Sequence, residues 1–200
     1  AHPFAAGCAT IHQLDAHAAT GHLREALALA QAVVDSRAPN VHWIRATLGR
    51  LRFQLGDVAG ARDELERLAA DGFDDIPRGI RWIKSMVEIG ELAADLGASA
   101  PAERLSRLLA PYADLHGVLP VPVAYGGPVR GVLARLRCAL GDAGESLPMF
   151  EQAIASCSAL GARPARARLL AHRAAAAEQC GERTLAREAG ELALGEAERL

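Results

Sequence analysis

The chain contains 200 residues with a formal net charge of −2, and hydrophobic residues make up 50% of it. This apolar content excludes an intrinsically disordered chain, and the small net charge argues against a general binder of nucleic acid or of anionic membranes. No apolar run approaches the roughly 18 residues that a transmembrane helix needs. We therefore expect a folded chain with neither a nucleic-acid contact nor a membrane partner.

The cysteines indicate the cellular location of the protein, and the two chain ends indicate that it is a fragment. Four cysteines show no CxxC spacing, so they predict neither a zinc site nor a disulfide framework. Reduced cysteines of this kind favour a cytoplasmic location. The chain starts at Ala1 without an initiator methionine or a signal sequence, and it ends at Leu200 within a helical pattern. From these ends we expect a fragment of a larger protein.

A repeat organises the sequence. Five glycines each end one helical apolar pattern and precede another, at intervals of 35, 41, 44 and 40 residues: Gly21, Gly56, Gly97, Gly141 and Gly181. Only glycine adopts a positive φ without a Cβ clash, so we expect each of them just past the end of a first helix. A small residue follows each glycine by five positions: Ala26, Ala61, Ala102, Ser146 and Ala186. Small residues let two antiparallel helices approach closely, which predicts one helical hairpin per repeat.

The apolar spacing predicts ten helices and no strand of consequence. Their expected ranges are 4–20, 22–36, 41–55, 58–71, 78–96, 99–114, 128–140, 143–160, 163–180 and 182–200. One hairpin cannot bury its apolar face alone, but stacked hairpins can. We therefore expect an all-α superhelix, a solenoid of about five antiparallel hairpins that forms a single domain over residues 1–200.

The segment 115–127 breaks the repeat. It has two prolines and three glycines, and it is too long for a tight hairpin link and too apolar for a solvated loop. We expect it to pack across the end of the stack or into its concave face. It is then either an ordered lid over the core or a loop that contacts a ligand or partner.

A search for catalytic and metal-binding motifs finds none. His12, His17 and His22 are five residues apart, so each is rotated by about 140° from the last and they share no helix face. The sequence has no HExxH, GxxxxGK[ST] or GxSxG motif, and the loop carboxylates lack the calcium-loop spacing. We predict no catalytic, cofactor-binding or metal-binding residue, and no enzyme.

The first helices of the hairpins supply the candidate binding surface, because such helices line the inside of a helical-hairpin stack. Its candidate residues are Trp43, Arg50, Phe53, Lys84, Glu91, Arg135 and Arg168. Four cations and a tryptophan in one groove are suited to an acidic peptide, a carboxylate terminus or a phosphorylated small molecule. In the alternative interpretation, Trp43 belongs to the core and the arginines are surface residues with good helix propensity.

The register resembles the tetratricopeptide repeat, with its best match at Gly141, Ser146, Phe150 and Ala153. The intervals of 40–44 residues are longer than the 34 of the standard repeat. Short segments in order along residues 40–200 are similar to the C-terminal helical region of LuxR-type and ATPase-containing, cyclase-linked bacterial regulators. They include LLAPYAD at 108–114, ALGD at 139–142, FEQA at 150–153 and LGARP at 160–164. The resemblance implies a sensor or scaffold module rather than the catalytic one.

Two functions follow from this resemblance. The first is a protein-interaction module of a bacterial signalling or transcriptional regulator, whose partner is a protein, a peptide or another domain of the same chain. The second is a small-molecule effector-sensing domain of such a regulator. An enclosed cavity beneath residues 115–127 favours the sensor, and an open charged groove favours the interaction module. Apolar faces left at the ends of the stack favour a homodimer.

Overall fold

The computed structural model describes residues 3–36, 41–120 and 123–200, and within them the chain forms ten α-helices and a short β-hairpin. The helices are α1 Pro3–Ala19, α2 Leu23–Asp35, α3 His42–Gln54, α4 Val58–Ala69, α5 Trp82–Asp95, α6 Ser99–Leu109, α7 Val129–Ala139, α8 Ala143–Ala159, α9 Arg163–Gln179 and α10 Arg183–Ala197. In this part of the chain, no helix has the length and apolar character to cross a bilayer.

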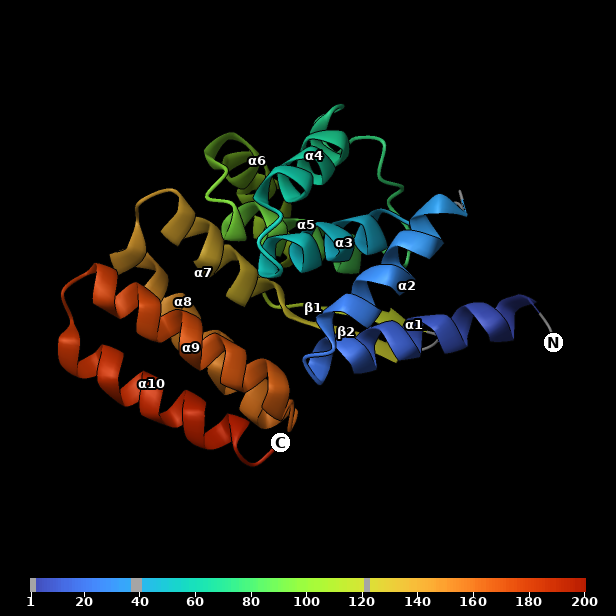
Figure 1. Ribbon diagram of the computed structural model, residues 1–200. Helices are drawn as coiled ribbons and strands as arrows, with labels where there is room; N and C mark the ends of the chain where they lie inside the picture. The colour runs from blue at the N-terminus through green and yellow to red at the C-terminus, as the bar shows by residue number, and fades with distance from the viewer. Residues whose placement is uncertain (1–2, 37–40, 121–122) are drawn as a thin grey trace. The chain divides into compact units, whose positions relative to one another are not determined.

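The chain divides into two compact units. The first comprises residues 1–96 and 117–125, and the second comprises residues 97–116 and 126–200. In the first unit α1 packs on α2, α2 on α3, and α3 on both α4 and α5. In the second unit α6 packs on α7, and α7, α8 and α9 each pack on the helix that follows (Figure 1). Both units therefore consist of successively packed helices, as the repeat predicts, but the two helices of the third predicted hairpin, α5 and α6, belong to different units.

The five repeat glycines confirm the predicted register. All five have φ values between 59° and 91°, each at the turn between two helices. At Gly56 the backbone N–H of Asp57 donates to the carbonyl of Arg52 at 2.8 Å, which satisfies an end carbonyl of α3. Gly161 makes a similar turn with a φ of 66°, although it lies outside the predicted register.

Close helix packing depends on the predicted small residues. Ala26, Ala61, Ala102 and Ser146 are fully buried, and Ala186 of the last repeat is half-buried. The helices approach even more closely at two glycines. A Cβ at Gly49 would lie 2.7 Å from Leu92 Cδ2, and one at Gly131 would lie 2.6 Å from Leu169 Cδ2. Since real Cβ atoms do not approach so closely, glycine at these positions sets the spacing of α3 to α5 and of α7 to α9.

The prediction of no strand is wrong for the segment that breaks the repeat. Strand β1, His116–Pro120, pairs with β2, Val123–Pro128, in a two-stranded sheet, while residues 121–122 of this segment lie outside the described residues. Gly117 and Leu119 are buried and Val118 between them is exposed. This alternation is the signature of a strand, and the glycines and prolines around it hide it in the sequence.

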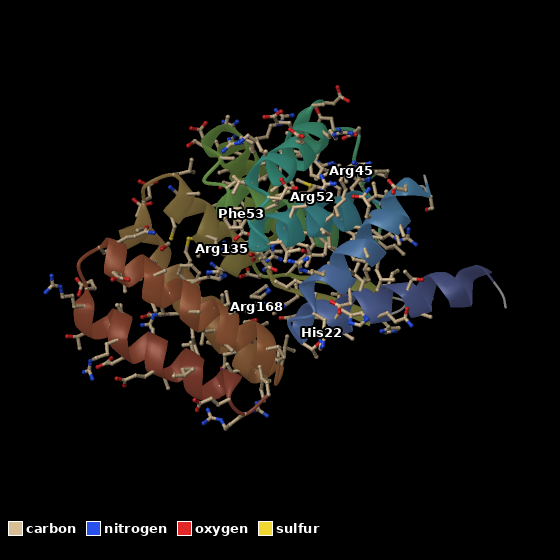
Figure 2. All side chains as sticks on the ribbon, in the orientation of Figure 1. His22, Arg45, Arg52, Phe53, Arg135 and Arg168 are labelled. Atoms are coloured by element: carbon tan, nitrogen blue, oxygen red, sulfur yellow. The ribbon has the colours of Figure 1, made fainter. Side chains whose placement is uncertain are left out.

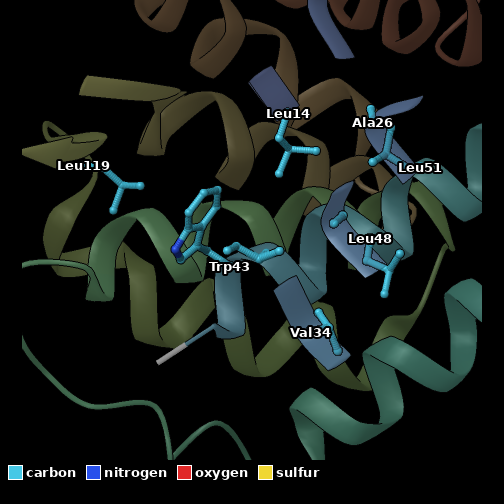
Figure 3. Close-up of a cluster of buried hydrophobic side chains, with 9 residues drawn as sticks. Leu14, Ala26, Val34, Trp43, Leu48, Leu51 and Leu119 are labelled. Atoms are coloured by element: carbon cyan, nitrogen blue, oxygen red, sulfur yellow. The ribbon is translucent and has the colours of Figure 1, made fainter. Parts of the chain in front are cut away.

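Strand β1 contributes to the core of the first unit. Leu119, which is 3% exposed, belongs to the same buried cluster as Leu14, Trp43 and Leu48 (Figure 3). A Cβ at Gly117 would lie 3.1 Å from the side chain of Val87 on α5. Residues 117 and 119 of β1 thus pack onto this core, which fits the lid interpretation for this part of the segment.

The two largest shifts of a predicted helix boundary are both in the third hairpin. The first helix of the third hairpin begins at Trp82 and not at Arg78, because residues 70–81 form a series of turns in which Phe73 has a φ of 71°. The second helix of that hairpin ends at Leu109 and continues as a single 3₁₀ turn, Ala110–Tyr112. Because α5 begins later than predicted, residues 70–81 form a loop, and this loop lines a pocket of the first unit.

Candidate functional site

The seven predicted groove residues are divided between the two units. Five lie on α3 and α5 of the first unit: Trp43, Arg50, Phe53, Lys84 and Glu91. Arg135 on α7 and Arg168 on α9 belong to the second unit, where Arg135 is buried and Arg168 is exposed. Figure 2 shows Phe53, Arg135 and Arg168 on their helices. The common groove of all seven therefore stays a prediction, and we describe each group within its own unit.

A buried charge cluster joins α3 to α5. Lys84 makes a short hydrogen bond to Glu88, one helical turn along α5, and only 4% and 8% of the two side chains are exposed. Arg50 of α3 lies 3.3 Å from Glu88, 3.7 Å from Glu91 and 3.2 Å from Asp95. The guanidinium of Arg50 therefore faces three carboxylates of α5.

Burial and charge act in opposite directions on this cluster. Burial raises the pKa of Glu88, but the nearby Lys84 and Arg50 outweigh it and hold that pKa below its usual value. Burial also lowers the pKa of Arg50, and the three carboxylates outweigh that effect and raise it. Glu88 and Arg50 are therefore both charged at neutral pH, and an acidic ligand at Arg50 or Lys84 would have to displace carboxylates already held there.

Trp43 supports the core interpretation of the sequence. Its side chain is 3% exposed and lies in the buried cluster of the first unit. The Lys84 ammonium stands 5.5 Å from the centre of its ring, a cation–π distance. Trp43 therefore covers a buried cation and does not present a free surface to a ligand.

A second polar network, missed in the sequence, joins α2, α3 and α4. Arg45 and Arg52 of α3 (Figure 2) donate to the two oxygens of the buried Glu64 on α4, at 2.7 and 3.1 Å. Arg52 also donates to Gln31 of α2 at 2.9 Å. Residues 45 and 52 are seven positions apart, which places them on one helix face, and this spacing is the signal from which the network was predictable.

The first unit has a pocket of about 320 Å³ where the turns of residues 70–81 meet α3 and α5. Its lining residues are His42, Ile76, Pro77, Gly79, Ile80, Arg81 and Ser85. Ile80 is 77% exposed, which is unusual for a large aliphatic side chain. Next to the pocket, the Arg78 guanidinium stacks over Trp82 at 4.6 Å from the ring centre. The pocket thus combines an apolar wall with one cationic side chain in its lining, that of Arg81.

The second unit has a smaller, polar pocket of about 190 Å³ at the base of the hairpin. Its lining residues are Ala113, Asp114, Leu115, His116, Pro128, Arg130, Gln152, Ala153 and Ser156. His116 Nε2 and Ser156 Oγ are 2.7 Å apart, and Arg130 makes a short ion pair with Asp114. Burial lowers the pKa of His116, so its imidazole is neutral at pH 7.

The described residues contain no group of three or more histidine, cysteine or acidic side chains arranged to hold a metal ion. All four cysteines are free. Cys138 Sγ lies 3.1 Å from Ser146 Oγ, and burial raises the pKa of the Cys138 thiol despite this hydrogen bond. A thiol with a raised pKa is a poor nucleophile, so Cys138 acts as a packing residue.

Comparisons with known proteins agree with this architecture. Residues 17–79 match the family model of the tetratricopeptide repeat. Two crystal structures of nearly identical repeats of this type, from a putative kinesin light chain of Podospora anserina, are similar in fold. One of them has a TM-score of 0.53 and 22% identity over 98% of this chain and 96% of that chain. The other has a TM-score of 0.52 and 20% identity over 98% and 97%.

A structure of MamA from MSR-1 is 24% identical over 95% of both chains, but its TM-score is only 0.45. No curated protein matches the chain. At these identities the solved structures show the fold alone, which is a tetratricopeptide-like helical repeat. Repeats of this type are as a rule protein-interaction scaffolds.

Proposed function

We propose that the chain is the non-catalytic protein-interaction module of a cytoplasmic bacterial signalling or transcriptional regulator. The pocket of about 320 Å³ beside α3 and α5 carries this proposal, because it lies at the end of the segment that matches the tetratricopeptide repeat. The regulator context rests only on the short segments along residues 40–200 that are similar to such regulators. The partner is a protein or peptide segment, either separate or from another domain of the same chain.

The chemistry of this pocket defines the segment that it suits. Ile80 and Pro77 supply an apolar wall, and an aliphatic side chain of a partner gains most by covering the exposed Ile80. Arg81 supplies a cation on the same rim. An apolar anchor followed by an acidic residue is therefore the expected motif in the partner segment.

Selection from a random peptide library displayed on phage tests this function. We expect the intact chain to enrich peptides with an aliphatic anchor next to an acidic residue, and Ile80→Glu to abolish their binding. Val58→Glu is the matched control, because Val58 is 43% exposed in the same unit and lies outside the pocket lining. Failure to enrich any peptide, or equal binding by the Ile80→Glu variant, would contradict the proposal.

A second candidate function is effector sensing by the same kind of regulator. The observation that favours it is the polar pocket of about 190 Å³ at the base of the hairpin, where His116, Arg130 and Ser156 converge. A thermal-shift screen of metabolites tests it, since a ligand at 100 times its Kd stabilises the folded chain by about 2.7 kcal/mol. A screen in which no metabolite shifts the transition would rule the sensor out.

A further inference from the structure

The charges that line the polar pocket of the second unit limit the kinds of ligand that it can bind. One cation, Arg130 at the start of α7, and one carboxylate, Asp114 after α6, stand among its lining residues. The other polar groups in the lining are the neutral side chains of Gln152, His116 and Ser156. The formal charge of the pocket is therefore zero, with one charge of each sign.

The two charged side chains differ in their exposure to solvent. The side chain of Asp114 is 87% exposed, whereas that of Arg130 is 27% exposed and is held closer to the protein. Their ion pair is open to solvent at its acidic end, so separating the two groups costs little. A ligand with both a carboxylate and an ammonium replaces this one exposed pair by two pairs, one with each partner.

The dimensions of the pocket exclude most metabolites. Its volume of about 190 Å³ is below the roughly 300–1,000 Å³ of ordinary small-molecule sites. A nucleotide or an oligosaccharide is too large for it. A simple anion is disfavoured for another reason, because the Asp114 carboxylate repels a ligand that brings only negative charge.

We propose that this pocket binds a free α-amino acid with a small polar side chain. The guanidinium of Arg130 receives the ligand carboxylate through paired N–H donors, and Asp114 turns to receive the ammonium group. Gln152 and the Ser156 hydroxyl, which His116 holds at 2.7 Å, face the ligand side chain. This inference rests on the second candidate function, since it names the effector that the sensor would take.

Isothermal titration calorimetry of the intact chain with each of the common amino acids tests the inference. We expect at least one amino acid with a small polar side chain to bind, and its N-acetyl and decarboxylated derivatives to bind about tenfold more weakly or not at all. Arg130→Gln and Asp114→Asn should each weaken binding by a similar factor. Arg137→Gln, on the same helix but paired with Asp142 and Glu145 outside the pocket, should leave it unchanged.

Three outcomes would overturn the inference: no amino acid binds at about 10 mM, the N-acetyl derivative binds as tightly as the free amino acid, or Arg130→Gln retains full affinity. Ser156→Ala provides a second variant if the Arg130 variant fails to fold. A metabolite of another class that stabilises the chain in the thermal-shift screen would leave effector sensing intact while removing the amino acid as the ligand.

Discussion

Each unit contains a carboxylate that several cations surround, and the two differ in the burial of those cations. In the first unit Glu88 meets Lys84, whose side chain is 4% exposed, and Arg50, whose side chain is 22% exposed. In the second unit Glu196 meets Arg163, Arg166 and Arg199, whose side chains are 33–62% exposed. The same ion-pair chemistry is thus found inside a helix interface at Glu88 and at the edge of one at Glu196.

This difference separates two roles for charge in the fold. A buried charge that loses its partner is strongly destabilising, whereas an exposed pair contributes little because water and salt replace it. The first-unit cluster therefore holds α3 and α5 in one arrangement. The second-unit arginines keep their charge accessible, as do the arginines on the rims of the two pockets.

The largest expected effect comes from Lys84→Met. It leaves Glu88 buried with only Arg50 at 3.3 Å, and we expect the free energy of unfolding to fall by about 3–5 kcal/mol. Chemical denaturation measures this loss. The double variant Lys84→Met/Glu88→Leu is the control, and it should recover most of the stability because it removes the carboxylate that Lys84→Met leaves short of a partner, while Arg50 keeps Glu91 and Asp95. Arg166→Met in the second unit should cost much less, and an equal loss in the two units would contradict the comparison.

The next effect tests whether the hairpin belongs to the core of the first unit. Leu119→Ala removes a side chain that is 3% exposed, and we expect a loss of about 2–5 kcal/mol. The neighbouring Val118 is 43% exposed, so Val118→Ala is a matched control within the same strand and should lie within about 0.5 kcal/mol of the parent. Similar losses for the two variants would mean that the strand does not cover this core.

The repeat was predictable from the sequence because its turns need one residue type. Glycine at positions such as 56 and 141 marks a backbone conformation that other residues avoid, so the helical hairpins follow from glycine spacing alone. The buried cluster was harder to predict, because Lys84 and Glu88 are four residues apart and this spacing is equally typical of an exposed helix face. Only the covering Trp43 and Arg50, distant in sequence, distinguish the two cases.

The strands and both pockets escaped the sequence analysis for a similar reason. The alternation of buried and exposed side chains in β1 extends over too few residues to stand out from the surrounding glycines. The pockets are lined by segments distant in sequence, such as His116 and Ser156, which are 40 positions apart. The contact between these two residues depends on how β1 lies against α8, and no local motif carries that information.

Turn glycines should behave alike in both units. Val at a positive φ costs about 1–3 kcal/mol in backbone strain. Gly56→Val and Gly141→Val, with φ values of 88° and 91°, have no atom within 4 Å of the added Cβ, so we expect this conformational cost alone. Thermal unfolding measures it. Gly190→Ala, in α10 with open space around it, is the control and should be neutral or slightly stabilising. Tolerance of both valine variants would contradict the repeat register.

The pH dependence of stability offers a smaller test. The pKa of Glu88 is lower in the folded chain than in the unfolded chain. As the pH falls, the Glu88 carboxylate is therefore protonated in the unfolded chain before it is protonated in the folded chain. Its contribution is complete above the usual glutamate pKa of about 4.3, and it disappears as the pH falls through the lower pKa of the folded state. We expect Glu88→Gln to flatten the acid side of the stability curve measured by denaturation. An unchanged slope would show that Glu88 is not held ionised by Lys84 and Arg50.

The smallest expected effect concerns salt. Hydrogen bonding to Arg199 and the nearby arginines outweigh desolvation and hold the pKa of Glu196 below its usual value, as the buried cations do for Glu88. Because the arginines around Glu196 are open to water, about 1 M salt should screen them and raise the pKa of Glu196 towards its usual value. The pKa of Glu88 should change less, since Lys84 is buried.

Carboxyl chemical shifts followed by NMR measure both pKa values in one titration. Arg187→Gln is the control variant. It removes an exposed ion pair with Glu191, and it should leave the pKa values of Glu88 and Glu196 unchanged. If salt raises both pKa values equally, water reaches the α3–α5 cluster. The contrast between the buried cations around Glu88 and the accessible arginines around Glu196 is then wrong.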